Sequence, residues 1–101
     1  MDNLATMNIY LNAIDKKGQT FLHWACEWGS PYVVNMFMHS LTALGIDVNT
    51  TDNAGQTAFH LACRYGHFYV AKIFMENSAT LSIELNTQDN EGQTALYLAC
   101  K

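Results

Sequence analysis

The chain has 101 residues, of which 50% are hydrophobic and 14% are charged. This is enough apolar material for one continuous core, so the composition excludes a disordered chain. The net charge is -4, which excludes a general attraction to nucleic acids or to anionic membrane surfaces.

The sequence also lacks patterns typical of a membrane span, a secretory signal or a disulfide framework. No apolar run approaches the roughly 18 residues of a membrane span, and the first residues lack the basic and apolar zones of a secretory signal. The three cysteines are an odd number at wide and regular spacing, which does not fit a disulfide framework. We therefore expect reduced thiols in an intracellular protein, either cytoplasmic or nuclear.

A segment that begins at Asp15 occurs three times, and each copy starts 37 residues after the previous one. The copies have the sequences DKKGQT, DNAGQT and DNEGQT. The agreement continues at Leu22, Phe59 and Leu96, at Ala25, Ala62 and Ala99, and at Cys26, Cys63 and Cys100. A fixed period of this size indicates a solenoid, in which each unit leaves apolar surface for its neighbours to cover.

The period divides the chain into units of one domain, residues 1–101. Residues 1–14 are expected to be the end of a preceding unit, and 15–51 and 52–88 to be complete units. Residues 89–101 are expected to be the start of a further, truncated unit. Because both ends fall inside a unit, we expect the chain to be part of a longer array.

Within each unit, a polar Gly-Gln-Thr turn precedes a first helix of about two turns. Thr20 and its equivalents are predicted to be N-caps, whose hydroxyl accepts from the amide three residues on. Gly29 should end the first helix, and Pro31 suits the start of a second helix. That helix carries an apolar stripe at helical spacing, which includes Val33 and Phe37. The pattern predicts an all-α chain of helix-turn-helix units.

Each unit then continues into a loop, Ile46–Asn49 in one copy and Ile83–Asn86 in the next. Apolar and polar residues alternate there, which predicts a short extended stretch before an Asx-type turn at Asp52 or Asp89. The turns should project as hairpin-like fingers from one edge of the stack. We attribute the repeated aspartates to turn capping rather than to a carboxylate site.

The segments GQTFLHWACEWGSPYVVNMF and GQTAFHLACRYGHFYVAKIF resemble the ankyrin motif G-x-T-x-L-H-x-A-x-x-x-G-x-x-x-V, and IDVNTTD and IELNTQD resemble its loop. The resemblance covers essentially the whole chain in phase. It implies an ankyrin-repeat solenoid of stacked helix-turn-helix units with hairpin-like loops. Ankyrin units usually span about 33 residues, and the extra residues here fall near 41–44 and 78–81. Since they amount to about one helical turn, we predict a lengthened second helix.

A histidine and a cysteine lie one helical turn apart at His23 and Cys26, and again at His60 and Cys63. This spacing could serve a metal ion or an activated nucleophile. The pair recurs in step with the packing residues, however, and Tyr97 replaces the histidine in the third copy. We therefore expect the histidine to hydrogen-bond near the capping threonine and the cysteine to fill a small packed site.

Other catalytic patterns are missing from the sequence, including a phosphate-binding loop, a nucleophile elbow and zinc-binding cysteine pairs. We predict that the chain is not an enzyme and needs no cofactor and no metal. His39 and His67 occur singly and are expected to be exposed.

The resemblance implies that a partner protein is held in a concave groove formed by the fingers and the exposed side of the first helices. At most of these positions the units differ from one another, as expected where packing does not fix the residue. The candidate partner-binding residues are Lys16, Lys17, Gln19, Glu27, Trp28, Asn53, Ala54, Gln56, Arg64, Tyr65, Asn90, Glu91 and Gln93, with Lys101 as a further candidate. The aromatic Trp28 and Tyr65 are typical anchors. The alternative is that they only cover the helix ends at Gly29 and Gly66.

In the ankyrin family, loop asparagines can be substrates of asparaginyl hydroxylases, which favour an upstream leucine and an acidic residue just before the target. Asn49 fits this pattern best, because Leu41 and Asp47 precede it. The alternative is that Asn49 only hydrogen-bonds its loop.

Taken together, the residues and the resemblance predict a protein–protein interaction module, a scaffold in signalling or gene regulation that binds neither nucleic acid nor membrane directly. Two alternatives stay open. The chain could be a structural segment of a longer ankyrin array, or an accessory, non-catalytic domain of a larger enzyme. Fold alone does not choose among them.

Overall fold

The computed structural model describes residues 13–40, 43 and 45–100. Within these residues the chain forms helices and loops, and no strand. The helices follow in the order α2 (Phe21–Trp28), α3 (Pro31–Met38), α5 (Ala58–Arg64), α6 (Phe68–Glu76), α7 (Ser78–Leu81) and α8 (Ala95–Cys100). The predicted all-α stack of helix-turn-helix units is confirmed.

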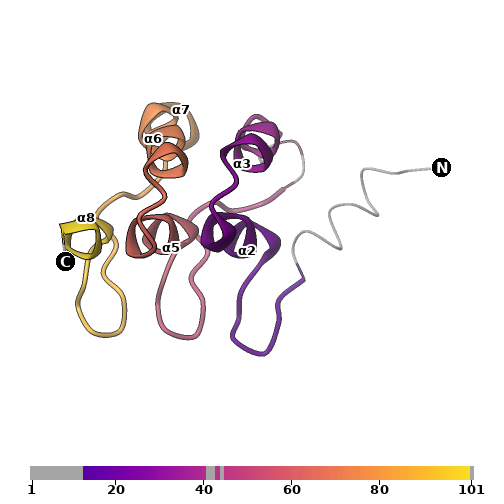
Figure 1. The fold of residues 1–101 in the computed structure, drawn as a ribbon. Coiled ribbons are helices and arrows are strands. Elements are labelled where there is room, and N and C mark those ends of the chain that lie inside the picture. Colours follow the sequence, from indigo (N-terminus) through magenta and orange to yellow (C-terminus); the bar gives the residue numbers. More distant parts are fainter. Residues whose placement is uncertain (1–12, 41–42, 44, 101) are drawn as a thin grey trace.

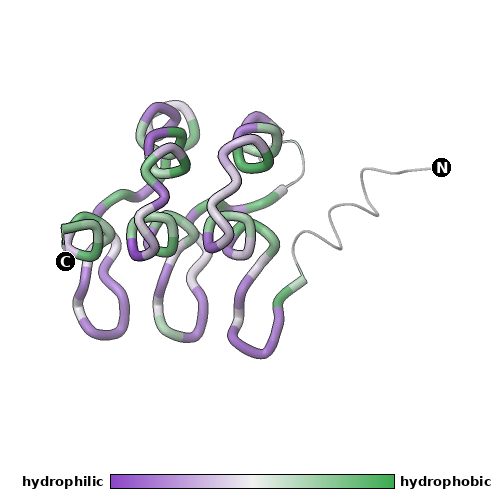
Figure 2. Tube along the Cα trace, viewed as in Figure 1, coloured by the Kyte–Doolittle hydropathy of each residue, from purple (hydrophilic) through white to green (hydrophobic). Residues whose placement is uncertain are grey.

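The helices form two rows (Figure 1). One row contains the first helices α2, α5 and α8, and the other contains the second helices α3 and α6, with α7 at the end of α6. Helices pack on their neighbours within each row, and α2 and α5 also pack on α3 and α6. The loops before α2, α5 and α8 project from the first row as hydrophilic fingers (Figure 2).

The first helices begin at reciprocal caps. The hydroxyl of Thr20 accepts from the amide of His23 at 3.5 Å, and the Thr20 amide donates to Nδ1 of that histidine at 3.2 Å. Thr57 and His60 form the same pair at 3.2 Å and 3.1 Å. Such a box satisfies amides that have no partner within the helix. The predicted threonine caps and the role of the histidines beside them are confirmed.

The turn between the helices is also as predicted. Gly29 ends α2 with φ of 76°, a left-handed conformation that glycine adopts without strain. Ser30 then caps α3, since its hydroxyl accepts from the Val33 amide at 3.4 Å, and Pro31 occupies the first turn. Proline loses nothing at this position, because the amide it lacks would have no helical partner.

The prediction of a lengthened second helix is wrong for the second complete unit. α6 ends at Glu76, and the extra residues form the separate single turn α7 after a break at Asn77. Side chains cause this break: the side-chain amide of Asn77 donates to the Ile73 carbonyl at 2.8 Å, and the Ser78 hydroxyl donates to the Met75 carbonyl at 2.9 Å. Short polar side chains that compete for helix carbonyls in this way end helices. In the first unit, 41, 42 and 44 lie outside the described residues.

The predicted extended stretch at Ile46–Asn49 was also wrong. The Asn49 amide donates to the Asp47 carboxylate at 2.9 Å, and the Thr50 amide donates to the Asp47 carbonyl at 3.2 Å. An Asx turn therefore begins at Asp47, because its short side chain captures the backbone two residues on.

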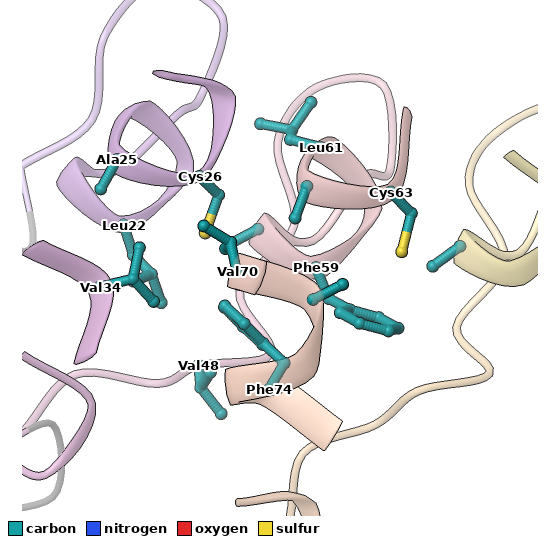
Figure 3. Packing of buried hydrophobic residues seen from close by; sticks show 14 of the residues in the cluster. Leu22, Ala25, Cys26, Val34, Val48, Phe59, Leu61, Cys63, Val70 and Phe74 are labelled. Carbon is teal, nitrogen blue, oxygen red and sulfur yellow. The ribbon is translucent and has the colours of Figure 1, made fainter. Parts of the chain in front are cut away.

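The core lies between the two rows of helices (Figure 3). Phe74, Met38 and Leu61 are the largest apolar side chains that are almost completely buried. Phe74 stacks on Phe59 with ring centroids 5.6 Å apart, which joins α6 to α5. Burying a side chain of this size contributes about 2–3 kcal/mol of transfer free energy, so this contact holds the two helices of one unit together.

Candidate functional site

Each finger is closed by its aspartate. The Asp52 carboxylate accepts from the backbone amides of Ala54 and Gln56, both at 2.9 Å. Asp15 and Asp89 close the other fingers in the same way. The predicted turn capping is confirmed, and it gives the fingertips a fixed shape.

Neighbouring fingers are joined by asparagines. Asn53 donates from its backbone amide to the Lys17 carbonyl at 2.9 Å, and from its side chain to the Lys16 carbonyl at 3.0 Å. Asn90 bonds the finger of Asn53 in the same way. A Cβ atom at Gly18 would lie 2.6 Å from the Asn53 side-chain oxygen, so only glycine allows this approach. We call these bonds the finger ladder.

The capping histidines extend the ladder to the base of the fingers. Nε2 of His23 lies 2.9 Å from the Gln56 carbonyl, and Nε2 of His60 lies 3.0 Å from the Gln93 carbonyl. With a proton on Nε2, each ring donates to the next unit and accepts at Nδ1 from its own threonine. Sequence reasoning missed this bond between units, although the recurrence of histidine in step with the motif was a signal for it.

His67 is another such contact, and its expected exposure was wrong. It is half-buried, and its Nε2 lies 2.8 Å from the Glu27 carbonyl of the preceding unit. A Cβ atom at Gly29 would lie 2.4 Å from its ring, so the glycine makes room for the histidine. His39 is exposed, as expected.

A hollow of about 310 Å³ opens between the first two fingers and the helices behind them. It collects eight of the predicted binding residues, namely Lys16, Lys17, Gln19, Glu27, Asn53, Ala54, Gln56 and Tyr65. Asp52 and Leu61, which were not predicted, complete its lining. We call it the concave hollow.

The floor of the concave hollow is tied together by amides. Gln19 is only 9% exposed, and its side chain donates to the Asp52 carboxylate at 3.3 Å. Gln56 donates to the same carboxylate at 3.4 Å. The bond to Asp52 holds Gln19 in the floor, and its contact with a partner stays a prediction, whereas Tyr65 is 51% exposed at the rim.

Trp28 occupies the position on α2 that is equivalent to Tyr65 on α5, and it is 73% exposed. Its ring packs edge-on against Trp24 with centroids 6.0 Å apart. The Trp24 indole in turn donates to the Asp15 carboxylate at 3.0 Å. Sequence reasoning missed Trp24 as a surface residue; the signal was an indole at a position where the other units have leucine.

The remaining predicted residues lie toward the third finger. Arg64 donates from Nε to the Gln56 side chain at 2.9 Å, and its guanidinium lies 3.9 Å from the Asp89 carboxylate. Glu91 and Gln93 line a separate hollow of about 300 Å³ together with Tyr97. Asn90 is exposed on the same finger, and Lys101 lies outside the described residues.

The first finger combines both signs of charge. Backbone hydrogen bonds from Gln19 and Lys17, the indole of Trp24 and the charge of Lys17 hold the pKa of Asp15 below its usual value of 3.8, against an opposing effect of burial. Asp15 is therefore ionised at neutral pH beside two exposed lysines, Lys16 and Lys17.

Asn49 lies apart from the concave hollow, in the loop that follows α3. Its side chain donates to the Ser82 carbonyl at 3.0 Å and accepts from the Glu84 amide at 2.8 Å. Both polar atoms of the amide thus hold the next unit, and Ser82 adopts a left-handed φ of 55° at this contact. Hydroxylation of Asn49 stays a prediction.

The cysteines carry free thiols. Cys26 and Cys63 fill packed sites as predicted, and Cys100 in the third copy is exposed. Burial raises the pKa of Cys63 to about 11, and it raises the pKa of Cys26 further, with a smaller effect from the charge of Cys63. Protonated thiols are poor nucleophiles at neutral pH.

Two further properties concern the described part of the chain. In residues 13–40, 43 and 45–100, no group of three or more His, Cys, Asp or Glu side chains is placed to hold a metal ion. None of the helices in these same ranges combines the length and apolar character needed to cross a membrane.

Comparison with known protein families identifies the repeats. A family model described as ankyrin repeats (3 copies) matches residues 37–101, and one described as ankyrin repeat matches residues 17–53. No curated protein matches the chain. Ankyrin repeats are generally protein–protein interaction modules and are typically non-catalytic. The repeated caps, the stacked helix pairs and the family matches agree, and the chain belongs to the ankyrin repeat family.

Proposed function

We propose that the chain is an intracellular scaffold that holds a partner protein in the concave hollow. The observation that carries this proposal is that eight of the predicted binding residues line one hollow, from two fingers and two first helices. Solenoid proteins commonly use an extended concave surface for binding. Free thiols at buried positions support a reducing, intracellular location.

Two exposed aromatic residues supply the anchors: Tyr65 lines the concave hollow, and Trp28 lies outside its lining at the end of α2. Trp28 and Tyr65 are 73% and 51% exposed at equivalent positions of successive units. Tyrosine and tryptophan are enriched among residues whose truncation weakens binding by about 2 kcal/mol or more. The Trp24 ring packs against the Trp28 ring. A partner that crosses both units would therefore meet two large side chains at a fixed spacing.

Charge gives the surface a direction. Lys16 and Lys17 are exposed on the first finger, and Glu91 is exposed on the third. A partner segment with an acidic end and a basic end would be oriented by this difference, because complementary charge selects orientation and speeds association more than it adds affinity. Higher salt should therefore slow association, with a smaller effect on dissociation.

The test is quantitative capture of proteins from cell extract with the parent chain and with the variant Trp28→Ala/Tyr65→Ala. Each variant must first be shown to fold by circular dichroism. We expect the double variant to lose the partner at least about tenfold, because two anchors are removed.

The chain offers a matched control. Tyr32 and Tyr69 also stand at equivalent positions of successive units, and they are 78% and 75% exposed on α3 and α6. The variant Tyr32→Ala/Tyr69→Ala removes as much aromatic surface outside the concave hollow, and it should retain the partner. Equal capture by all three chains would defeat the proposal and favour a structural segment of a longer array or an accessory domain.

A further inference from the structure

The concave hollow differs from the next junction between units at one position of the first helix. Glu27 lies near the end of α2 and lines the concave hollow. Its equivalent 37 residues later, near the end of α5, is Arg64. The fingers and first helices around the concave hollow belong to the two complete units, 15–51 and 52–88. A carboxylate therefore stands in this hollow at the position where the next unit has a guanidinium.

Arg64 shows how a guanidinium is held at this position. Its Nε donates to the side-chain oxygen of Gln56 at 2.9 Å, and its Nη2 lies 3.9 Å from the Asp89 carboxylate. Asp89 is 7% exposed, so the cation lies beside a buried carboxylate. The planar guanidinium carries five donors in a fixed fork, which suits two neighbouring acceptors. The second junction thus contains a glutamine, an arginine and an aspartate that contact one another in sequence.

The same two acceptors are present in the concave hollow without the cation. Gln19 is the equivalent of Gln56, Asp52 is the equivalent of Asp89, and both line the hollow. They are only 9% and 8% exposed. Gln19 uses its side-chain nitrogen to bond Asp52 at 3.3 Å. Within residues 13–40, 43 and 45–100, no hydrogen bond reaches the side-chain oxygen of Gln19 and no ion pair reaches Asp52. Two buried acceptors therefore line a hollow that holds no guanidinium.

The Asp52 carboxylate has room for a stronger donor. Its Oδ1 accepts from the backbone amides of Ala54 and Gln56, both at 2.9 Å. Its Oδ2 accepts only at greater length from the side chains of Gln19 and Gln56, at 3.3 Å and 3.4 Å. Hydrogen bonds from a guanidinium to a carboxylate are typically about 2.7–2.9 Å long and roughly twice as strong as those between neutral groups. A charged donor at Oδ2 would therefore be better bound than either amide.

Glu27 makes a cation more favourable still. It is half-buried, and its carboxylate accepts hydrogen bonds but cannot supply the donor that Arg64 supplies. Two carboxylates that line one hollow repel each other, and a cation between them relieves the repulsion. Lys16 and Lys17 line the hollow as well, but they are exposed at the fingertip. The concave hollow is therefore acidic toward its floor and basic at the fingertip.

We propose that the partner protein inserts an arginine side chain into the concave hollow. Its guanidinium bonds the side-chain oxygen of Gln19 and the Asp52 carboxylate, and the charge of Glu27 attracts it. An acidic residue next to this arginine would meet Lys16 and Lys17. The inference rests on the proposed function and names the chemistry of the partner at that site. Lysine fits less well, because an ammonium group is a point charge that does not span two acceptors as a fork.

The probe is acetyl-arginine amide, added to the full chain labelled with ¹⁵N. The side-chain amide signal of Gln19 reports binding, because this group lies in the floor of the hollow. We expect saturable shifts with a dissociation constant on the order of 1 mM, as befits so small a ligand. Acetyl-citrulline amide has nearly the same shape without the charge, and it should bind at least about fivefold more weakly. Acetyl-lysine amide should also bind more weakly.

Variants of the chain locate the site. Glu27→Gln removes one charge from the hollow and should weaken binding of acetyl-arginine amide by about threefold to tenfold. Glu27→Arg places a guanidinium of the chain itself at the site and should abolish binding. Glu76→Gln removes the same charge from an exposed position on α6 and should leave the affinity unchanged. Absence of saturable shifts, equal binding of acetyl-citrulline amide, or affinity that ignores Glu27→Gln would overturn the proposal.

Capture from cell extract separates this inference from the proposed function. Glu27→Arg, once shown to fold by circular dichroism, should lose the partner that the parent chain captures. If Trp28→Ala/Tyr65→Ala loses the partner and Glu27→Arg retains it, the hollow binds without an arginine, and the inference fails while the proposed function stands. Equal capture by the parent chain and both variants would remove the proposed function and this inference with it.

Discussion

The finger side and the helix side of the stack join their units by different physics. On the finger side, the bonds of His23 to Gln56 and of His60 to Gln93 have nearly the same length, 2.9 Å and 3.0 Å. On the helix side, the first junction buries Met38 completely, but Met75 is left 52% exposed at the second. The polar ladder needs only the next finger, while the apolar core needs the next pair of helices.

This difference shows what each side contributes. A hydrogen bond between fingers replaces a bond to water and adds about 1 kcal/mol, but it fixes register and spacing. Apolar burial between helices is less directional and supplies most of the stability. The fingers can therefore vary at their tips while the concave hollow keeps its shape.

Among changes in the apolar core between the helices, Phe74→Ala should lower the free energy of unfolding most. The side chain is 0% exposed and joins α6 to Phe59, so we expect a loss of about 3–5 kcal/mol in the free energy of unfolding. Urea denaturation followed by circular dichroism measures it. Phe68→Ala on the same helix is the control, because Phe68 is 67% exposed. Similar losses in both variants would contradict the assignment of stability to the buried apolar core.

The corresponding change on the finger side is His60→Ala. It removes a buried ring that bonds Thr57 and the Gln93 carbonyl, and it should lower the free energy of unfolding by about 1–3 kcal/mol. Tyr97→Ala at the equivalent position should have an effect of less than about 0.5 kcal/mol, since Tyr97 is 54% exposed. The same denaturation experiment compares them, and a larger effect of Tyr97→Ala would reverse the order of the two junctions.

Asn49 and Asn86 are equivalent residues of successive units, and they compare a bonded side chain with an exposed one. Asn49→Ala removes two hydrogen bonds to the next unit and should lower the free energy of unfolding by about 1–2 kcal/mol. Asn86→Ala should change it by less than about 0.5 kcal/mol, because Asn86 is exposed. Thermal and urea unfolding of both variants give the measurement. Equal effects would mean that the two bonds of Asn49 do not stabilise the stack.

Much of this architecture could be predicted from the sequence, because it depends on local rules. Thr20 as a cap, Pro31 at a helix start and Asp52 as a turn former act within a few residues of their own position. The break at Asn77 is local too, but it depends on which of several carbonyls a short side chain captures, and composition does not specify that choice.

The bonds between units were harder to predict. His23 and His67 look alike as single letters, yet one caps a helix beside the next finger and the other fills the space at Gly29. Eight candidate residues did converge on the concave hollow. Gln19 and Gln56 among them are the same in the copies, and each donates to the Asp52 carboxylate.

The reactivity of the cysteines compares burial in successive units without any substitution in the chain. Cys26 on α2 and Cys63 on α5 are equivalent buried thiols, 0% and 6% exposed, and Cys100 on α8 is exposed. With iodoacetamide at neutral pH and mass mapping of each site, Cys100 should react first, Cys63 more slowly and Cys26 last, because accessibility and thiolate content both fall in this order from Cys63 to Cys26. Faster reaction of Cys26 than of Cys63 would contradict it.

The raised pKa of the Cys63 thiol also predicts how stability depends on pH. The pKa of Cys63 is raised from 9.0 to about 11 on folding, so between these values the unfolded chain loses the proton while the folded chain keeps it. Folding then weakens as pH rises through this window, and the contribution is fully present below pH 9.0. In urea denaturation from neutral pH to the alkaline range, Cys63→Ala should show a shallower decline than the parent chain. Parallel declines would indicate that the Cys63 thiol is as hydrated in the folded chain as it is in the unfolded chain.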